Sequence, residues 1–294
     1  MGSAGKPVSI LLTYRDIAKH QALVPWKRER QVEQDLLLCL AMKAIFTDGF
    51  LSGQVAMRGG TLLHKVHLAP AARYSEDIDL VVHGDRPEGH IEKALGRVLL
   101  PVLGKPVGFG WESVKLAIRN AVQPSRVLRL SYSVPNVSGD GPALDIVVEA
   151  NVTERVSYLP VVRVPYAFEF RGERAEFSVN GYETHEMLGT KMRALFQRRR
   201  GRDLFDLYWA LEHLREAVNP ERVTECFLFY LQKEGGAAGR QEFLEILDRH
   251  LQDKGFCSDM EPLLRIGIDY DPQAAGRLVK ECLLAILPEY SAKG

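Results

Sequence analysis

The segment Asp77-Ile-Asp-Leu-Val-Val82 is the feature that most restricts how this chain can fold. Apolar residues alternate with two acids, which predicts a strand over 78–83 that turns Ile78 and Leu80 into a core and leaves Asp77 and Asp79 together on the other face. Two carboxylates at that spacing repel each other unless a divalent cation lies between them. Mg²⁺ suits such a pair, because it binds through few carboxylates and completes its shell with waters and substrate phosphates. The segment therefore predicts a sheet that carries a Mg²⁺ site.

A glycine pair precedes this strand. We expect a strand over 54–58, a turn at Gly59-Gly60, and a short helix that opens at Thr61 and runs to His67. Glycines allow a close approach of the backbone to a ligand, and a helix N-terminus binds phosphate. Either motif alone is common in ordinary turns and strand ends. Their order and short separation predict a phosphate-binding turn beside a metal-binding strand.

A third carboxylate is expected from the predicted strand over 143–150, in which Asp145, Val147 and Glu149 share one face. We expect Asp145 to complete a two-metal site and to accept the proton of an attacking hydroxyl. Glu149 is the alternative, and both could instead be surface acids of a half-exposed strand.

A basic run follows further along the chain. Between Met187 and Arg202 there are six basic residues and no acidic residue. Lys191 and Arg198 share one helical face, and the compact charge of Lys191 suits a triphosphate. The arginines suit RNA phosphates. Arginines are also favourable at the solvated C-terminal end of a helix, where they interact with the helix dipole. The predicted RNA-binding residues are Arg198, Arg199, Arg200 and Arg202.

The secondary-structure pattern changes near residue 182. We expect a mixed part over 1–182 that begins with helices, including one over 29–48, and a helical part over 183–294. Further elements of the first part are a helix over 87–100 and strands over 126–134, 161–170 and 175–179. The helices expected in the second part span 183–196, 203–215, 220–233, 241–250 and 272–287.

Composition excludes several classes of protein. The 38 basic residues balance 38 acidic residues, so any nucleic-acid-binding surface must be a local patch. No apolar stretch is long enough to span a bilayer, and the four cysteines lack the spacing of a disulfide framework or a zinc finger. Because the N-terminus also lacks the apolar core of a signal peptide, we expect a cytoplasmic protein without a membrane partner, and a monomer.

Taken in order, these motifs resemble the AbiEii/AbiGii nucleotidyltransferase toxins of type IV-like toxin–antitoxin systems, a group that includes the mycobacterial MenT proteins. The resemblance covers roughly residues 50 to 210. The matching segments are Gly59-Gly-Thr61, Arg73-x-Ser-x-Asp-x-Asp79, Leu144-Asp-Ile146, Lys191-x-x-Ala194 and Arg202-Asp-Leu-Phe-Asp-Leu207.

The resemblance implies an α+β fold: a polymerase-β-like nucleotidyltransferase core with a mixed sheet, followed by a helical C-terminal domain. It implies Mg²⁺-dependent transfer of a nucleoside monophosphate from an NTP to the 3′ acceptor end of tRNA, which blocks aminoacylation and translation. It also implies a cognate antitoxin. Alternatives are a nucleotidyltransferase that modifies a protein hydroxyl or a small molecule, and a degenerate core that acts as a binding module.

Site roles follow residue by residue from the same resemblance. The NTP-binding set is Gly59, Gly60, Thr61, Ser75 and Lys191, and the catalytic set is Asp77, Asp79, Asp145, Lys191 and Asp206. The metals are assigned to Asp77, Asp79 and Asp145. Thr61 stands where serine is commoner and keeps the hydroxyl. Ser75 is expected beside the metal carboxylates, although a serine at this point could also be an ordinary turn residue.

Overall fold

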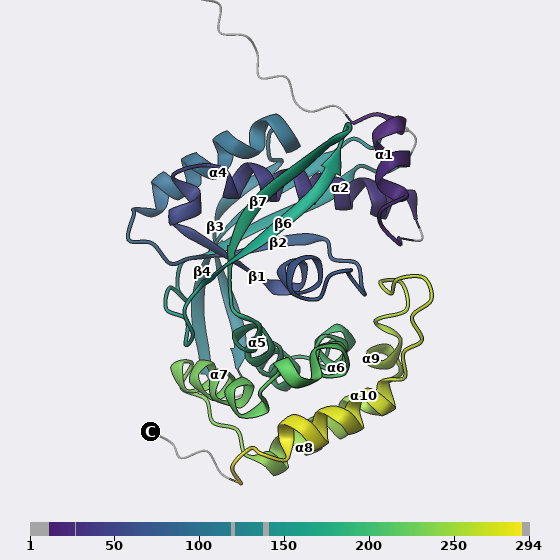
Figure 1. The fold of residues 1–294 in the computed structure, drawn as a ribbon. Coiled ribbons are helices and arrows are strands. Elements are labelled where there is room, and N and C mark those ends of the chain that lie inside the picture. The colour runs from purple at the N-terminus through teal and green to yellow at the C-terminus, as the bar shows by residue number, and fades with distance from the viewer. Residues whose placement is uncertain (1–11, 27, 119–120, 138–140, 290–294) are drawn as a thin grey trace, which may run out of the picture.

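The structure is a computed structural model that describes residues 12–26, 28–118, 121–137 and 141–289. Its centre is a seven-stranded mixed sheet with strand order β3-β4-β5-β2-β1-β7-β6 (Figure 1). The strands are β1 (Val55–Arg58), β2 (Asp77–Val82), β3 (Gly108–Ile118), β4 (Ala121–Val134), β5 (Leu144–Asn151), β6 (Val162–Phe170) and β7 (Glu173–Gly181).

Pairing within the sheet places β2 between two differently oriented neighbours. Strand β1 runs antiparallel to β2, whereas β5 runs parallel to it. The exposed and buried residues of β2 alternate at its start, with Ile78 and Leu80 buried, and then Val81 and Val82 are buried together. The predicted strand and the inward direction of its apolar residues are therefore confirmed.

Three helices cover one side of the sheet: α1 (Tyr14–Gln21), α2 (Glu29–Phe46) and α4 (Glu88–Leu103) (Figure 1). Helix α2 packs on β2, β5 and β7 and is buried along most of its length, which explains its long run of leucines. Helix α4 packs against α2 and β4. A one-turn 3₁₀ helix, η1 (Leu51–Gly53), leads from α2 into β1.

The connection from β1 to β2 begins with α3 (Gly59–Leu62) and continues as a π-helical turn, η2 (Leu63–His67). The helix therefore starts at the glycine pair and not at Thr61 as predicted. Figure 1 shows this connection between the sheet and the C-terminal helices. It is one of the segments that link the two parts of the chain.

The rest of the chain is helical. The elements are α5 (Thr184–Gln197), α6 (Gly201–Leu214), η3 (Arg215–Ala217), α7 (Pro220–Lys233), α8 (Arg240–Leu251), α9 (Lys254–Ser258), α10 (Pro272–Val279) and η4 (Lys280–Leu284). Between α9 and α10 the chain returns to the sheet, where Tyr74 N donates to Leu263 O (2.8 Å) and Arg265 N donates to Ala72 O (2.9 Å). The helical part thus holds the segment that enters β2.

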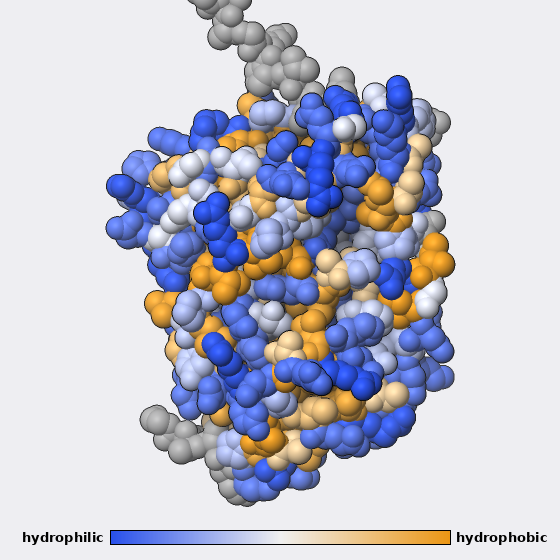
Figure 2. Space-filling model, viewed as in Figure 1, coloured by the Kyte–Doolittle hydropathy of each residue, from blue (hydrophilic) through white to orange (hydrophobic). Residues whose placement is uncertain are grey.

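Sequence predictions located most of these elements and missed some. Helix α1 and strand β3 were not predicted as separate elements, and β4 begins five residues earlier than expected. The predicted helix over 272–287 ends as α-helix at Val279 and continues as the π-helical turn η4. No helix among the described residues is long and apolar enough to cross a membrane. On the face shown in Figure 2, hydrophobic patches are small and separated by hydrophilic residues.

A buried ionic cluster joins the N-terminal helices to η2. Asp35 on α2 is 1% exposed and accepts hydrogen bonds from Lys65 Nζ (2.6 Å) and Trp26 Nε1 (2.9 Å), and its Oδ2 lies 2.8 Å from His20 Nε2. Despite the cost of burial, these partners lower the pKa of Asp35 to about 2, with Lys65 the strongest of them. His20, Asp35 and Cys39 are close enough to chelate a metal, but the Lys65 ammonium lies against both Asp35 and Cys39 and already satisfies the group.

We predict that Lys65→Met lowers the free energy of unfolding by about 3 kcal/mol, because it leaves Asp35 without its principal counter-charge. Lys43→Met, on the exposed side of the same α2 helix, is the control and should change stability by less than about 0.5 kcal/mol. Urea denaturation at pH 7 measures both. Equal effects of the two substitutions would show that the Asp35 cluster contributes nothing beyond surface charge.

Candidate active site

A cavity of about 520 Å³ lies between the polar edge of the sheet and helix α5. The sheet side contributes Asp77, Asp79, Arg129, Glu149 and Asn151, and the connection around β1 contributes Arg58, Gly59 and Gly60. The helical side contributes Thr190, Lys191, Arg193, Gln197, Arg198 and Arg202. Acids therefore predominate on one wall and cations on the other.

Four charged residues form a row across the sheet. Arg58 on β1 is opposite Asp79 on β2, Asp79 is opposite Glu149 on β5, and Glu149 is opposite Arg129 on β4. Arg129 Nε donates to Glu149 Oε1 at 2.8 Å. The backbone register thus brings two carboxylates side by side at the centre of the row, with an arginine at each end.

The structure does not place Asp145 where we expected it. Asp77 is opposite Val147, so Asp145 lies beyond the first residue of β2. The Asp145 side chain is exposed and absent from the cavity wall, where Glu149 is present. The prediction of Asp145 as the third carboxylate is therefore not supported by the geometry, because the parallel register of β2 and β5 selects the other acid on the same face.

The acids on this wall fit a divalent cation. Asp77 keeps solvent contact, yet desolvation by the surrounding cavity and repulsion from Asp79, Glu76 and Glu149 raise its pKa to about 7. A cluster of carboxylates with that much mutual repulsion is a group that Mg²⁺ would neutralise. Asp77, Asp79 and Glu149 are the residues that could hold it.

The glycine pair permits two close contacts at this wall. Gly59 has φ +80°, and a Cβ there would lie 1.9 Å from Asp79 Oδ2. A Cβ on Gly60 would lie 2.4 Å from Arg73 Nη2. Any larger residue at either position would displace a charged side chain of the site.

Thr61 is buried and does not line the cavity. Its Oγ1 lies 2.8 Å from Ser75 Oγ and 2.5 Å from Asp77 O, so it fixes the segment that leads into β2. Ser75 itself is half-buried and faces the cavity. Direct contact of Thr61 with a nucleotide is therefore not what the geometry favours.

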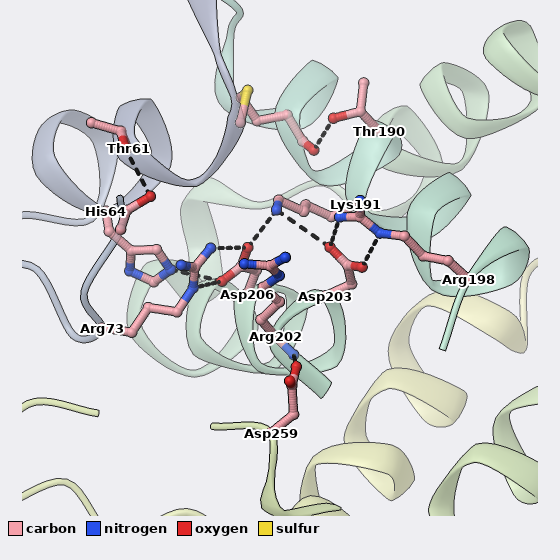
Figure 3. Close-up of polar contacts among 12 residues, drawn as sticks. Thr61, His64, Arg73, Thr190, Lys191, Arg198, Arg202, Asp203, Asp206 and Asp259 are labelled. Atoms are coloured by element: carbon pink, nitrogen blue, oxygen red, sulfur yellow. Dashed lines mark hydrogen bonds and ion pairs between the residues drawn. The ribbon is translucent and has the colours of Figure 1, made fainter. Parts of the chain in front are cut away.

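Asp206 on α6 is a fully buried centre of ion pairs and not a member of the cavity wall (Figure 3). Arg73 binds it through two parallel contacts, of which Nη2–Oδ2 is 2.8 Å, and Lys191 Nζ lies 2.7 Å from Oδ2. His64 Nε2 lies 2.8 Å from Oδ1. Arg73 and Lys191 hold the pKa of Asp206 well below its usual range in spite of burial. Our expectation of a catalytic Asp206 changes accordingly to a positioning role.

Asp203, one turn before Asp206, was not predicted as a site residue. It is fully buried, accepts from Arg198 Nε (2.7 Å) and Nη2 (2.9 Å), and lies 3.4 Å from Lys191 Nζ. Its place in the Arg-Asp-Leu-Phe-Asp segment, on the same helical side as Asp206, is the signal that could have identified it. Together the two acids orient Lys191, Arg73 and Arg198.

The basic run divides into two groups. Arg198 and Arg202 line the cavity, and the charge of Arg202 partly offsets the rise in the pKa of Asp77. Arg199 is exposed and pairs with Asp253 at 2.9 Å, and Arg200 is exposed at the start of α6. The structure therefore brings two of the four arginines to the site and places the other two on the surface beside it.

The other end of the cavity contains a second ionic network. Glu154, which follows β5, pairs with Arg58 and with Arg193 of α5, and Arg193 Nη1 also lies 2.7 Å from Glu234 Oε1. Gln197 Nε2 donates to Glu234 Oε2 at 2.7 Å. The two arginines lower the pKa of Glu154 to about 2 despite its burial. This network fixes α5 against the sheet.

The fold is one that nucleotidyltransferases share. A crystal structure of a candidate nucleotidyltransferase from H. pylori aligns with a TM-score of 0.51 and 16% identity, over 87% of this chain and 93% of the other. MenT4, a nucleotidyltransferase toxin from Mycobacterium tuberculosis, aligns with a TM-score of 0.55 and 15% identity, over 94% of this chain and 91% of the other. At sequence identities this low, the structural similarity establishes the fold alone.

The family is defined by the sequence itself. The family described as "Nucleotidyl transferase AbiEii toxin, Type IV TA system" matches residues 40–276, which is well over half of the chain. The chain belongs to the AbiEii nucleotidyltransferase toxins. None of the curated protein sequences is significantly similar to it.

Burial of His64 predicts a measurable pH dependence. Desolvation, aided by the charge of Arg73, lowers the pKa of His64 from 6.5 to about 4. Between these values the unfolded chain takes up a proton that the folded chain does not, so stability rises with pH from 4 to 6.5. We expect His64→Gln to remove about 3 kcal/mol of this rise in the free energy of unfolding, measured by urea denaturation across pH 4–7.

The control is His90→Gln, a substitution of an exposed histidine. Parallel stability curves for His64→Gln and the wild type would contradict the assignment.

Proposed function

We propose that this protein transfers a nucleoside monophosphate from an NTP to the 3′ acceptor end of tRNA and thereby blocks aminoacylation. The observation that supports it is the arrangement of Asp77, Asp79 and Glu149 opposite Lys191 and Arg198 across one cavity. This arrangement matches a substrate that carries a metal at one side of its phosphates and needs cations at the other. A cognate antitoxin, as the family name implies, would control the activity.

Each wall has a separate task in this reaction. Lys191, Arg198 and Arg202 bind the triphosphate, and their buried partners Asp203 and Asp206 hold the first two in place. Gly60 and Ser75 border the phosphates from the β1–β2 connection. When bound to Asp77, Asp79 and Glu149, Mg²⁺ would neutralise the phosphates and lower the pKa of an attacking hydroxyl. Glu149 would accept that proton, the role that we expected for Asp145.

Two other acceptors remain alternatives: a protein hydroxyl and a small molecule. The surface beside the cavity favours RNA, because Arg200 extends the positive charge beyond the space that an NTP would fill. A binding module without activity is disfavoured, since every acid of the metal wall is present.

Incubation with each α-³²P-labelled NTP, Mg²⁺, total RNA and a cell lysate distinguishes the acceptors. We expect label in tRNA, loss of label after removal of the 3′ terminal nucleotides, and no aminoacylation of the product. Label in protein or in a small molecule would support the alternatives. Absence of label with the wild-type protein under all conditions would refute nucleotidyl transfer.

A matched pair of acid substitutions tests the assignment of the third carboxylate. Glu149→Gln should reduce transfer at least about 100-fold, because it removes a metal ligand. Asp145→Asn, four residues earlier on the same strand face, should change transfer by less than about threefold. Asp77→Asn is the inactive reference. The opposite ranking of Glu149→Gln and Asp145→Asn would restore Asp145 as the metal ligand.

A second prediction separates acceptor binding from nucleotide binding. Arg200→Ala should weaken tRNA binding and reduce the slope of log K against log salt by about 0.7, as expected for one lost phosphate contact on single-stranded RNA. The apparent KM for the NTP should not change, since Arg200 lies outside the cavity wall. Arg215→Ala, at the far end of the same helix, is the control and should leave both values unchanged. An unchanged salt slope for Arg200→Ala would show that the basic run is a solvated helix end.

A further inference from the structure

Helix α5 divides the cavity into two chemically different sides. One side carries Lys191 and, directly after the helix end, Arg198; both pair with the buried acids of α6. The neighbouring stripe carries Thr190, Arg193 and Gln197, at helical spacings of three, four and seven residues. With Arg73 and Arg202, this side has four cations against the two acids Asp203 and Asp206, so it suits phosphates. The second stripe then borders the space that remains for the rest of a nucleotide.

The second side is nearly neutral in charge. Its two arginines, Arg58 and Arg193, are matched by two buried acids, Glu154 and Glu234. Such a balanced wall offers no net attraction to phosphate. It offers fixed hydrogen-bonding groups, which is what recognition of a nucleobase requires.

Gln197 presents a hydrogen-bond acceptor whose direction is fixed. Its Nε2 donates to Glu234 Oε2 at 2.7 Å, and Glu234 is 5% exposed and paired with Arg193. A carboxylate that is paired with an arginine accepts hydrogen bonds only, so the amide must turn its NH₂ group towards it. The carbonyl oxygen Oε1 is consequently the amide atom left for the cavity, which Gln197 lines.

The position of Gln197 also suits a base. It lies six residues beyond Lys191 on α5, which corresponds to roughly 9 Å along the helix. That separation is comparable with the span of a nucleotide from its phosphates to the outer edge of its base. Arg198, the next residue, is turned towards Asp203 of α6. A nucleotide whose phosphates contact the Lys191 and Arg198 side can therefore bring its base edge to the Gln197 side of the cavity.

We propose that Gln197 is a specificity-determining residue that accepts a hydrogen bond from the amino group at C4 of a cytosine or at C6 of an adenine in the NTP. The nucleotide it selects carries cytosine or adenine, whose amines are donors at the position where uracil and guanine carry a carbonyl oxygen. This inference rests on the proposed function for the placement of the nucleotide and adds the class of base.

Calorimetric titration of the full chain with nucleotides in Mg²⁺ tests the proposal without requiring transfer. CTP is compared with the triphosphate of 2-pyrimidinone riboside, which lacks the 4-amino group, and ATP with the triphosphate of purine riboside, which lacks the 6-amino group. α,β-Methylene forms of all four prevent turnover. For the wild type we expect the amine to contribute about tenfold to affinity in at least one pair.

The variant completes a thermodynamic cycle. Gln197→Leu should bind the preferred nucleotide about tenfold more weakly than the wild type does. Its affinity for that nucleotide should then equal its affinity for the amine-free partner. Gln232→Leu, an exposed glutamine of α7 that lies outside the cavity wall, should preserve the wild-type difference. Gln197→Met is a second variant, with a side chain of similar length and no amide. The comparison of the nucleotides on the wild-type protein does not depend on any variant folding.

Failure of the inference and failure of the proposed function give different results. Equal affinities for both members of both pairs, or an amine effect that persists in Gln197→Leu and Gln197→Met, overturn the role of Gln197 even if transfer occurs. In another outcome, the amine effect is present in the wild type and lost in the Gln197 variants while no label is transferred. That result supports base recognition and refutes nucleotidyl transfer. The same amine effect together with transfer supports both.

Discussion

The buried carboxylate of Asp206 is the contact on which the candidate site depends. It binds Arg73 from the segment before β2, Lys191 from α5 and His64 from η2, residues that lie far apart in the sequence. Burial of a lone carboxylate would be costly, and only several well-placed cations and hydrogen bonds can offset that cost. The same interaction therefore joins the helical part to the sheet and fixes the directions of two cations. Asp203 extends this arrangement to Arg198.

The second constraint is the register of the sheet. Parallel pairing of β2 with β5 sets Asp79 beside Glu149, and antiparallel pairing with β1 sets Arg58 on its other side. A shift of one residue would turn the carboxylates of one strand to the opposite face and bury them in the core under α2. The alternation of apolar residues in β2 and β5 prevents such a shift. The core and the acidic wall are consequently specified by the same residues.

Local pattern explains what the sequence could predict. The Asp-x-Asp strand, the glycine turn and the helices α5 and α6 follow from periodicity and turn residues within short windows. The choice between Asp145 and Glu149 could not be made in this way, because both acids share one face and only the pairing with a distant strand distinguishes them. The partners of Asp206 could not be predicted for a similar reason: His64, for example, is separated from it by 142 residues. In strand β3 the alternation of apolar residues changes phase at Glu112-Ser113, so no single strand face is defined by the sequence.

The charges of the cavity also bear on how its ligands bind. Around the buried acids Asp203 and Asp206, the cations Arg73, Lys191, Arg198 and Arg202 are in excess by two positive charges, whereas Asp77, Asp79 and Glu149 gather on the sheet side. An NTP alone would neutralise the first wall and bring its phosphates towards the acids of the second, and a cation alone would leave the first wall unmatched. A nucleotide that carries its metal satisfies both at once. The pKa of Asp77 is raised because no cation balances the neighbouring acids. Since metal and nucleotide each neutralise the wall that the other leaves charged, we expect each to strengthen the binding of the other.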